Sequence, residues 1–152
     1  MPLFDETKYF IPLMLIPWLF AIIYDKKNRW QLAILIPLVI IFVDQSGLFI
    51  KKTVLRPRPW AALYPELVNH LVGEKGRNYS FPSNHAANMT GLAMVFSSIY
   101  YRYGKLFGSV AGIVMVSRVY IGVHYPLDVL FGCLFGILIS FIIIKLWERY
   151  VD

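Results

Sequence analysis

The sequence predicts an all-α protein integral to a membrane, a bundle of about five transmembrane helices with a short amphipathic interfacial helix. The first reason is composition, because 58% of the 152 residues are hydrophobic and only 16% are charged. Soluble domains, in contrast, are about half apolar and a quarter charged. The second reason is that the apolar residues form long runs nearly free of charge. Each run has roughly 17 to 22 residues, enough to cross about 30 Å of hydrocarbon at about 1.5 Å per residue.

Five such runs are the expected spans, and charged or turn-forming residues set their ends. They cover residues 8–24, 30–50, 84–101, 105–121 and 126–147. The first run follows Asp5 and Glu6 rather than a basic cluster, and no small-residue cleavage site precedes Asp25. We therefore interpret it as a retained helix and not as a signal peptide. No second domain is evident, so residues 1–152 are expected to form one domain.

The longest segment outside the spans covers residues 51–83. Within it, "YPELVNHLVG" (64–73) is typical of a short amphipathic helix. Pro65 suits the first helical position, Gly73 suits the stop, and four aliphatic residues form one stripe. Such a helix is expected to lie in the plane of the interface. We interpret His70 within it as a solvated interfacial residue.

The net charge of +6 has a different meaning in a membrane than in water. In a soluble protein it would indicate nucleic acid. In a bilayer it indicates anionic headgroups, or loops held on one side by the positive-inside rule. The membrane is therefore the expected partner, and nucleic acid is not. Cys133 is the sole cysteine and lies within an apolar run, which argues against a disulfide framework or a thiolate metal site.

Three polar clusters interrupt the apolar pattern, and the order of the spans brings them together. They are "KKTVLRPRP" (51–59), "FPSNH" (81–85) and "SRVYIGVHYPLD" (117–128). The first follows the second span, the next opens the third span, and the last joins the fourth span to the fifth. All three are therefore expected at one membrane face. There are seven basic residues on the opposite face and eight on the face of the clusters, so the positive-inside rule alone does not set the orientation. If some of the cluster cations bind a ligand and are left out of the count, the face with the clusters is expected to be extracytoplasmic.

The residue types in these clusters suit a phosphate group. Three basic residues supply positive charge and donors for phosphate oxygens, and they are Lys51, Arg58 and Arg118. The "PSNH" turn opens a helix. The free N–H groups of Asn84 and His85, together with the Ser83 hydroxyl, are therefore expected to cradle an anion at the positive end of the helix dipole.

Two histidines with different neighbours suit an acid and a nucleophile. His124 and Asp128 are four residues apart, and Pro126 marks the first turn of the last span. Asp128 is therefore expected to reach back and fix the tautomer of His124, which makes the other ring nitrogen a better nucleophile or base. His85, on another helix, can protonate a leaving group.

The three clusters read K-x6-R-P (Lys51 to Pro59), P-S-N-H (Pro82 to His85) and S-R-x5-H-x3-D (Ser117 to Asp128). In order and spacing they resemble the type-2 phosphatidic acid phosphatase superfamily, which includes vanadium haloperoxidases and bacterial lipid phosphatases. The resemblance covers about half of the chain. There are two departures: the family's second motif normally has Gly at the position of Asn84, and its core usually has six spans.

The resemblance implies a mechanism without metal or cofactor. His124 attacks phosphorus to form a phosphohistidine, with Asp128 as its partner. His85 protonates the leaving oxygen and then activates the water that hydrolyses the intermediate. The phosphoryl oxygens are neutralised by Lys51, Arg58 and Arg118, helped by Ser83 and the helix-opening turn. The sequence agrees on the metal, because the segments near the site hold too few carboxylates for a two-metal phosphatase.

The expected substrate is a phosphorylated lipid, and the expected location is the inner membrane with the site on its periplasmic side. By resemblance the candidates are lipid A 1-phosphate, undecaprenyl diphosphate, phosphatidylglycerol phosphate and phosphatidic acid. Four cations outside the motifs indicate a headgroup with several negative charges, which favours lipid A or a diphosphate. They are Lys52, Arg56, Lys75 and Arg77.

Simpler interpretations remain open beside these. A Ser-Asn pair before a helix is often only an N-cap. Asp44, a carboxylate within a span, is a candidate supporting residue, paired with Lys51 or Arg118 across two helical turns. Ser117 is a second supporting candidate. As a whole, the chain could also be a non-catalytic phospholipid-binding or transport protein that retains the anion site. A vanadate peroxidase is disfavoured, because those relatives are soluble.

Overall fold

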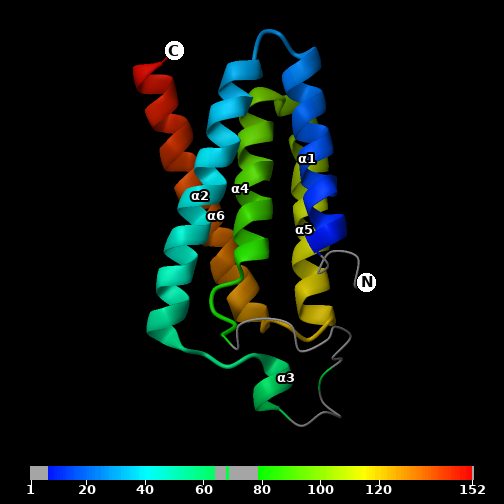
Figure 1. The fold of residues 1–152 in the computed structure, drawn as a ribbon, viewed down its shortest axis with the longest axis vertical. Coiled ribbons are helices and arrows are strands. Elements are labelled where there is room, and N and C mark those ends of the chain that lie inside the picture. Colours follow the sequence, from blue (N-terminus) through cyan, green and yellow to red (C-terminus); the bar gives the residue numbers. More distant parts are fainter. Residues whose placement is uncertain (1–6, 64–67, 69–78, 152) are drawn as a thin grey trace.

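The structure is a computed structural model that describes residues 7–63, 68 and 79–151. Those residues form helices and no strand, apart from an isolated antiparallel bridge between Pro57 and Tyr79. Five long helices run side by side, and the short α3 lies beyond one end of the bundle (Figure 1). In chain order the elements are α1 (Thr7–Tyr24), α2 (Arg29–Val54), α3 (Pro59–Ala62), α4 (Asn84–Ile99), the 3-10 helix η3 (Tyr101–Tyr103), α5 (Gly104–Tyr120) and α6 (Pro126–Tyr150).

The five long helices correspond to the five runs expected from hydropathy, and their ends differ by a few residues. The largest difference is at α2, which continues to Val54 and so carries Lys51 within its last turn rather than beyond its end. The short helix α3 was not predicted; it has Pro59 at its first position, where proline's missing N–H costs nothing. The predicted amphipathic helix over 64–73 falls almost wholly outside the described residues.

The outer faces of the long helices are apolar. On α6, for example, Leu130, Leu134, Leu138 and Phe141 are all exposed. A helix of a soluble protein would carry polar residues on that side, whereas a helix that is hydrophobic all round belongs in a core or a bilayer. Of the described helices, α2 and α6 are long and apolar enough to cross a membrane.

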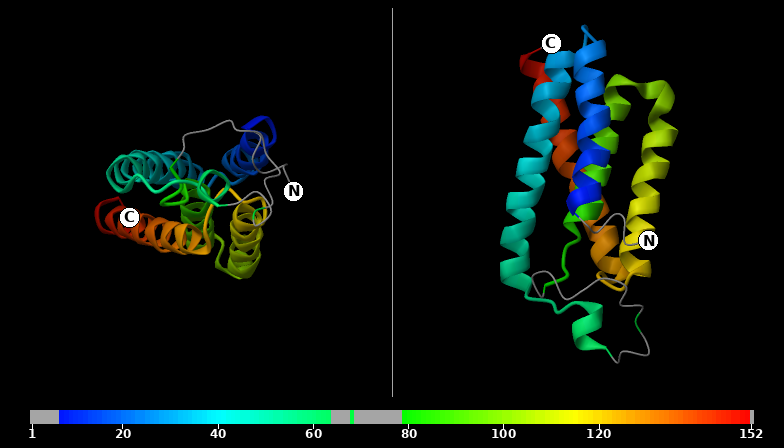
Figure 2. Two further views of the ribbon diagram at one scale, coloured as in Figure 1. Left: turned by 90° about the horizontal axis from the view of Figure 1, so that it is seen from below. Right: turned by 45° about the vertical axis from the view of Figure 1, so that its right-hand side comes forward.

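The central helix is α4, which packs against α2, α5 and α6 (Figure 2). Small residues allow its close approach to α6. A Cβ added at Gly132 would meet the carbonyl of Ser83, and one added at Gly136 would meet the carbonyl of Ala87. The G-x3-G pattern of α6 therefore marks close packing inside the fold. Thr90 on α4 also donates a hydrogen bond of 3.2 Å to the Cys133 carbonyl on α6.

This arrangement brings four helix termini to one end of the bundle. The end of α2, the start of α4, the end of α5 and the start of α6 all lie near α3, at the bottom of Figure 1. The three polar clusters of the sequence are attached to these termini. The three clusters therefore lie at one end of the bundle, as the order of the expected spans predicted.

Candidate active site

The buried cation Lys51 links α2 to the turn that opens α4. Its ammonium group donates hydrogen bonds to the carbonyl of Ser80, at 3.4 Å, and to the carbonyl of Pro82. Lys51 is 8% exposed. A lysine ammonium has three N–H donors and two of them are accounted for by these carbonyls. Lys51 therefore holds the turn in place and keeps a positive charge beside it.

The "PSNH" turn is anchored from two further sides. Ser83 is the N-cap of α4, and its hydroxyl oxygen accepts a hydrogen bond from the Ala86 N–H at 3.4 Å. The Ser83 N–H donates to the backbone carbonyl of Asp128 at 3.0 Å, which ties the turn to α6. The capping role, left open by the sequence, is thus present, and it is compatible with anion binding at the same helix terminus.

The Asn84 side chain lies away from the turn, between α4 and α2. Its amide donates to Asp44 Oδ1 at 3.0 Å, and the amide of Asn88 donates to the same oxygen at 3.0 Å. A Cβ added at Gly47 of α2 would lie 2.7 Å from Asn84 Oδ1. At the helix opening, therefore, Asn84 offers its backbone N–H, while its side chain joins two helices.

Asp44 was predicted to support Lys51 or Arg118, and it lies within electrostatic reach of Lys51. The hydrogen bonds that its Oδ1 accepts come from the two asparagines of α4. The reason is helical geometry. Asp44 faces α4 at the level of its first two turns, whereas Lys51 lies two turns farther along α2 and reaches the Ser80 and Pro82 carbonyls instead.

His124 and Asp128 approach each other as their spacing predicted. His124 lies in the segment between α5 and α6, where Gly122 adopts a positive φ of 74° that lets the chain turn. Its Nδ1 is 3.8 Å from Asp128 Oδ2, which is too long for a hydrogen bond. Burial, as the largest cause, lowers the pKa of His124 to about 4. The imidazole is therefore neutral at pH 7.

Asp128 is fully buried in the first turn of α6 and is shared among several partners. Oδ2 accepts the Tyr125 N–H at 2.9 Å and so caps the helix. Oδ1 accepts a hydrogen bond from Arg56 at 2.7 Å. The Arg56 guanidinium also lies over the Tyr125 ring, 4.1 Å from its centroid.

Arg56 was predicted from the sequence to contact the lipid headgroup, but in the structure it contacts Asp128 in the candidate site. Its side chain is 34% exposed and spans from the segment after α2 to the carboxylate on α6. One sequence feature could have indicated a site role for Arg56. The repeated R-P of "RPRP" (56–59) places two arginines at alternate positions of an extended segment. The second of them, Arg58, donates to the Val123 carbonyl at 3.3 Å, beside His124.

The remaining predicted residues complete the cluster. Arg118 is fully buried in the last turn of α5, and its Nε donates to the Ser117 hydroxyl at 3.4 Å. The Arg118 carbonyl accepts the His124 N–H at 3.3 Å. His85, in the first turn of α4, lies within electrostatic reach of Arg118, His124, Arg58 and Lys51. The two histidines and the three expected cations are therefore brought together.

The cluster is rich in basic side chains. Among the described residues, no group of three or more His, Cys, Asp or Glu side chains gathers where it could hold a metal ion. Positive side chains from α2, α5 and the segment after α2 surround two imidazoles and the Asp128 carboxylate. This arrangement suits an anionic oxyacid group such as phosphate.

Comparison with known protein families agrees with this chemistry. The family model described as the PAP2 superfamily matches residues 29–152. The chain belongs to the PAP2 superfamily. The match covers every element of the candidate site, so the resemblance expected from the three motifs is confirmed at the level of the family.

Two curated relatives carry more specific names. A lipid A 4'-phosphatase of Porphyromonas gingivalis is 31% identical over 96% of this chain and 67% of its own length. An undecaprenyl-diphosphatase of Sulfolobus acidocaldarius is 31% identical over 82% of this chain and 59% of its own length. The chain therefore spans between about three fifths and two thirds of these relatives.

A solved structure has a similar fold. The crystal structure of Aquifex aeolicus LpxE superimposes with a TM-score of 0.69 at 29% sequence identity. The superposition covers 88% of this chain and 76% of that one. The arrangement of long helices around α4 is thus shared with this relative.

Proposed function

We propose that this chain is an integral membrane lipid phosphatase that removes a terminal phosphate from a lipid phosphate or diphosphate. Membership of the PAP2 superfamily, with relatives named as lipid A and undecaprenyl diphosphate phosphatases, supports this function. The observation that carries it is the convergence of His85 and His124 with three cations at one end of an apolar bundle.

The proposed membrane placement has the five long helices as spans of a single domain. Their exposed apolar faces support contact with lipid. The candidate site then lies at one membrane face, and we assign that face to the extracytoplasmic side of the inner membrane. With the site cations discounted as ligands for phosphate, the remaining basic residues favour the opposite end as cytoplasmic.

In the proposed reaction, His124 is the nucleophile. Its low pKa of about 4 leaves a lone pair available at neutral pH. Nδ1 faces Asp128, so Nε2 attacks phosphorus. An N–P bond forms, the bond between phosphorus and the leaving oxygen breaks, and His85 supplies a proton to that oxygen. His85 then takes a proton from water, whose oxygen attacks phosphorus. The N–P bond breaks, its electron pair returns to Nε2 of His124, and phosphate is released.

The cations and the helix terminus stabilise the charge that develops on the phosphoryl oxygens. Lys51, Arg58 and Arg118 provide the fixed positive groups. Ser83 and the backbone N–H groups at the start of α4 add donors at the positive end of the helix dipole. Ser117 supports Arg118 through their hydrogen bond.

The favoured substrates are lipid A 1-phosphate and undecaprenyl diphosphate, with phosphatidylglycerol phosphate and phosphatidic acid as further candidates. The names of the two relatives support the first pair as a class. The ion pair between Arg56 and Asp128 removes one of the cations expected to contact the headgroup. Lys75 and Arg77 fall outside the described residues, which leaves Lys52 as the described candidate.

The direct test is phosphate release from a panel of these lipids by purified protein in the presence of EDTA. The wild type should release phosphate from at least one lipid, and His124→Ala should not, while remaining folded in detergent. Lipid binding without turnover in the wild type would instead favour a non-catalytic phospholipid-binding or transport protein. Turnover retained by His124→Ala would exclude the proposed nucleophile.

A further inference from the structure

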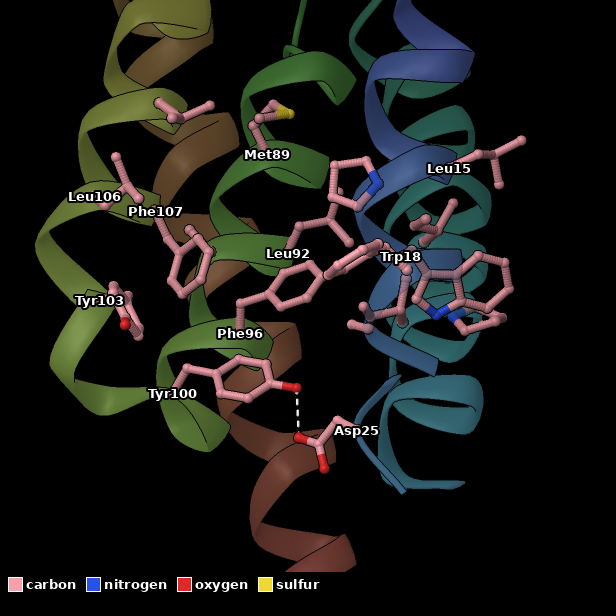
Figure 3. Close-up of a pocket in the computed structure, with 18 of the residues that line it drawn as sticks. Leu15, Trp18, Asp25, Met89, Leu92, Phe96, Tyr100, Tyr103, Leu106 and Phe107 are labelled. Atoms are coloured by element: carbon pink, nitrogen blue, oxygen red, sulfur yellow. Dashed lines mark hydrogen bonds between the residues drawn. The ribbon is translucent and has the colours of Figure 1, made fainter. Parts of the chain in front are cut away.

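A large apolar cavity lies between α1, α2, α4 and α5, away from the candidate active site. Its volume is about 1110 Å³, at the upper end of the range for ligand pockets, about 300–1,000 Å³. Figure 3 shows its lining, with Leu92 and Phe96 of α4 on one side and Leu15 and Trp18 of α1 on the other. The cavity separates α1 from α5, and its lining residues are almost all apolar. An apolar chain therefore fits it better than a polar ligand.

The length of the cavity matches one leaflet of a bilayer. Along α4 it extends from Met89 to Tyr100. At about 1.5 Å per residue, these eleven steps correspond to about 16 Å. Half of a hydrocarbon core is about 15 Å. A single acyl chain entering from the end marked by Tyr100 would therefore be covered along most of its length.

The end marked by Tyr100 has the character of a headgroup region. Tyr24, Trp30, Tyr101 and Tyr103 are exposed around it, and such aromatic side chains concentrate at membrane interfaces. Here the Tyr100 hydroxyl donates a hydrogen bond to Asp25 Oδ2 at 2.6 Å (Figure 3). This bond joins the connection between α1 and α2 to the connection between α4 and α5.

Those two connections form what we call the basic rim, defined as Lys26, Lys27, Arg29, Arg102 and Lys105. The same two connections contain one carboxylate, that of Asp25. The hydrogen bond from Tyr100, followed by that from Asn28, lowers the pKa of Asp25 to about 2. Asp25 is therefore charged, but its oxygens are already occupied by Tyr100, Asn28 and the Lys27 N–H. The rim as a whole remains strongly positive.

We propose that this cavity binds an anionic phospholipid of the leaflet opposite the candidate active site, with one acyl chain in the cavity and the headgroup on the basic rim. Charge complementarity selects an anionic lipid over a zwitterionic one. The inference rests on the proposed membrane placement but not on the phosphatase activity. The rim cations could instead serve only to orient the protein in the membrane. In that case filling the cavity should not change lipid binding, whereas it should weaken binding if a lipid acyl chain occupies the cavity.

The test is titration of the full chain in detergent with dioleoyl phosphatidylglycerol or dioleoyl phosphatidylcholine, with bound lipid counted by native mass spectrometry. Phosphatidylglycerol should bind at least about tenfold more tightly than phosphatidylcholine. Free glycerol phosphate should not compete, since it lacks the acyl chain. The double variant Lys26→Gln/Lys27→Gln should weaken binding by about fivefold for each cation removed, hence about 25-fold.

The matched control is Lys145→Gln/Arg149→Gln, which removes two cations at the same end of the bundle from α6, a helix that does not line the cavity. It should leave the affinity unchanged. Ala93→Phe fills the cavity from α4 with the rim intact, and Ala21→Phe does so from α1 should the first variant fold poorly. Either should abolish the tight binding of phosphatidylglycerol, because the acyl chain no longer fits. Equal binding of the two lipids, equal loss in the control, or full affinity in a filled and folded variant would overturn the proposal.

Discussion

Arg56→Gln is the substitution that most sharply separates a role in positioning from a role in substrate binding. The Arg56 guanidinium lies 2.7 Å from Asp128, which is fully buried. Removing one partner of a buried ion pair costs about 3–5 kcal/mol. Because Arg56 is 34% exposed and Asp128 keeps the Tyr125 N–H, we expect about 1–3 kcal/mol here.

The catalytic effect of this change should appear as a shift with pH. Under the proposed mechanism, the His124 pKa of about 4 should set the acid limb of kcat/KM in the wild type, because only a neutral imidazole is a nucleophile. Without Arg56, the full charge of Asp128 acts on His124 and favours the imidazolium. Arg58, Lys51, Arg118 and His85 still face the site, so the rise is limited to about 1–2 pKa units. The acid limb should therefore move to higher pH.

The assay measures kcat/KM as a function of pH with one short-chain substrate for all variants. The ionisation of the substrate then contributes equally to every pH profile. In Arg56→Gln, kcat should fall by about tenfold to a hundredfold with little change in KM, and Arg56→Lys should restore part of it. Lys52→Gln removes a neighbouring exposed cation and should keep the wild-type acid limb. A raised KM with an unmoved acid limb in Arg56→Gln would refute the reasoning and make Arg56 a headgroup ligand.

Three further predictions concern packing and titration. Asn84→Gly introduces the family's usual residue but removes a hydrogen bond to Asp44, so thermal unfolding in detergent should show a loss of about 0.5–1.5 kcal/mol with kcat nearly unchanged; a large loss of kcat would contradict this. Gly136→Ala drives a Cβ into an α4 carbonyl, whereas Gly112→Ala meets nothing within 4 Å, so only the first should destabilise the protein, by about 1–3 kcal/mol. The depressed pKa of His124 stabilises the fold above its unfolded pKa of about 6.5. That contribution should be lost as pH falls from there toward about 4, and the loss should be absent in His124→Gln.

Features set by local spacing were predictable from the sequence. The spans follow from apolar runs bounded by charges, and the approach of His124 to Asp128 follows from their four-residue separation at a proline-initiated helix. The shared face of the three clusters follows from the order of the spans. None of these needs knowledge of how one helix rotates against another.

Features set by helix rotation and long-range pairing were not predictable. Arg56 contacts a carboxylate 72 positions away, and nothing in its local sequence distinguishes that partner from a lipid headgroup. Asp44 was expected to support Lys51 or Arg118, and the sequence did not indicate that the packing of α2 on α4 also gives it hydrogen bonds from two asparagine amides. The cavity, likewise, arises from the distance between α1 and α5, which no sequence periodicity encodes.

The proposed covalent role of His124 is most directly tested by trapping the intermediate. A lipid labelled with ³²P in its terminal phosphate would be mixed with excess protein, and the reaction stopped with alkali, in which phosphohistidine survives. The wild type should carry the label on His124, His85→Asn should retain it for longer because water is no longer activated, and His124→Gln should carry none. Rapid phosphate release with no label on His124, or label retained by His124→Gln, would contradict the mechanism.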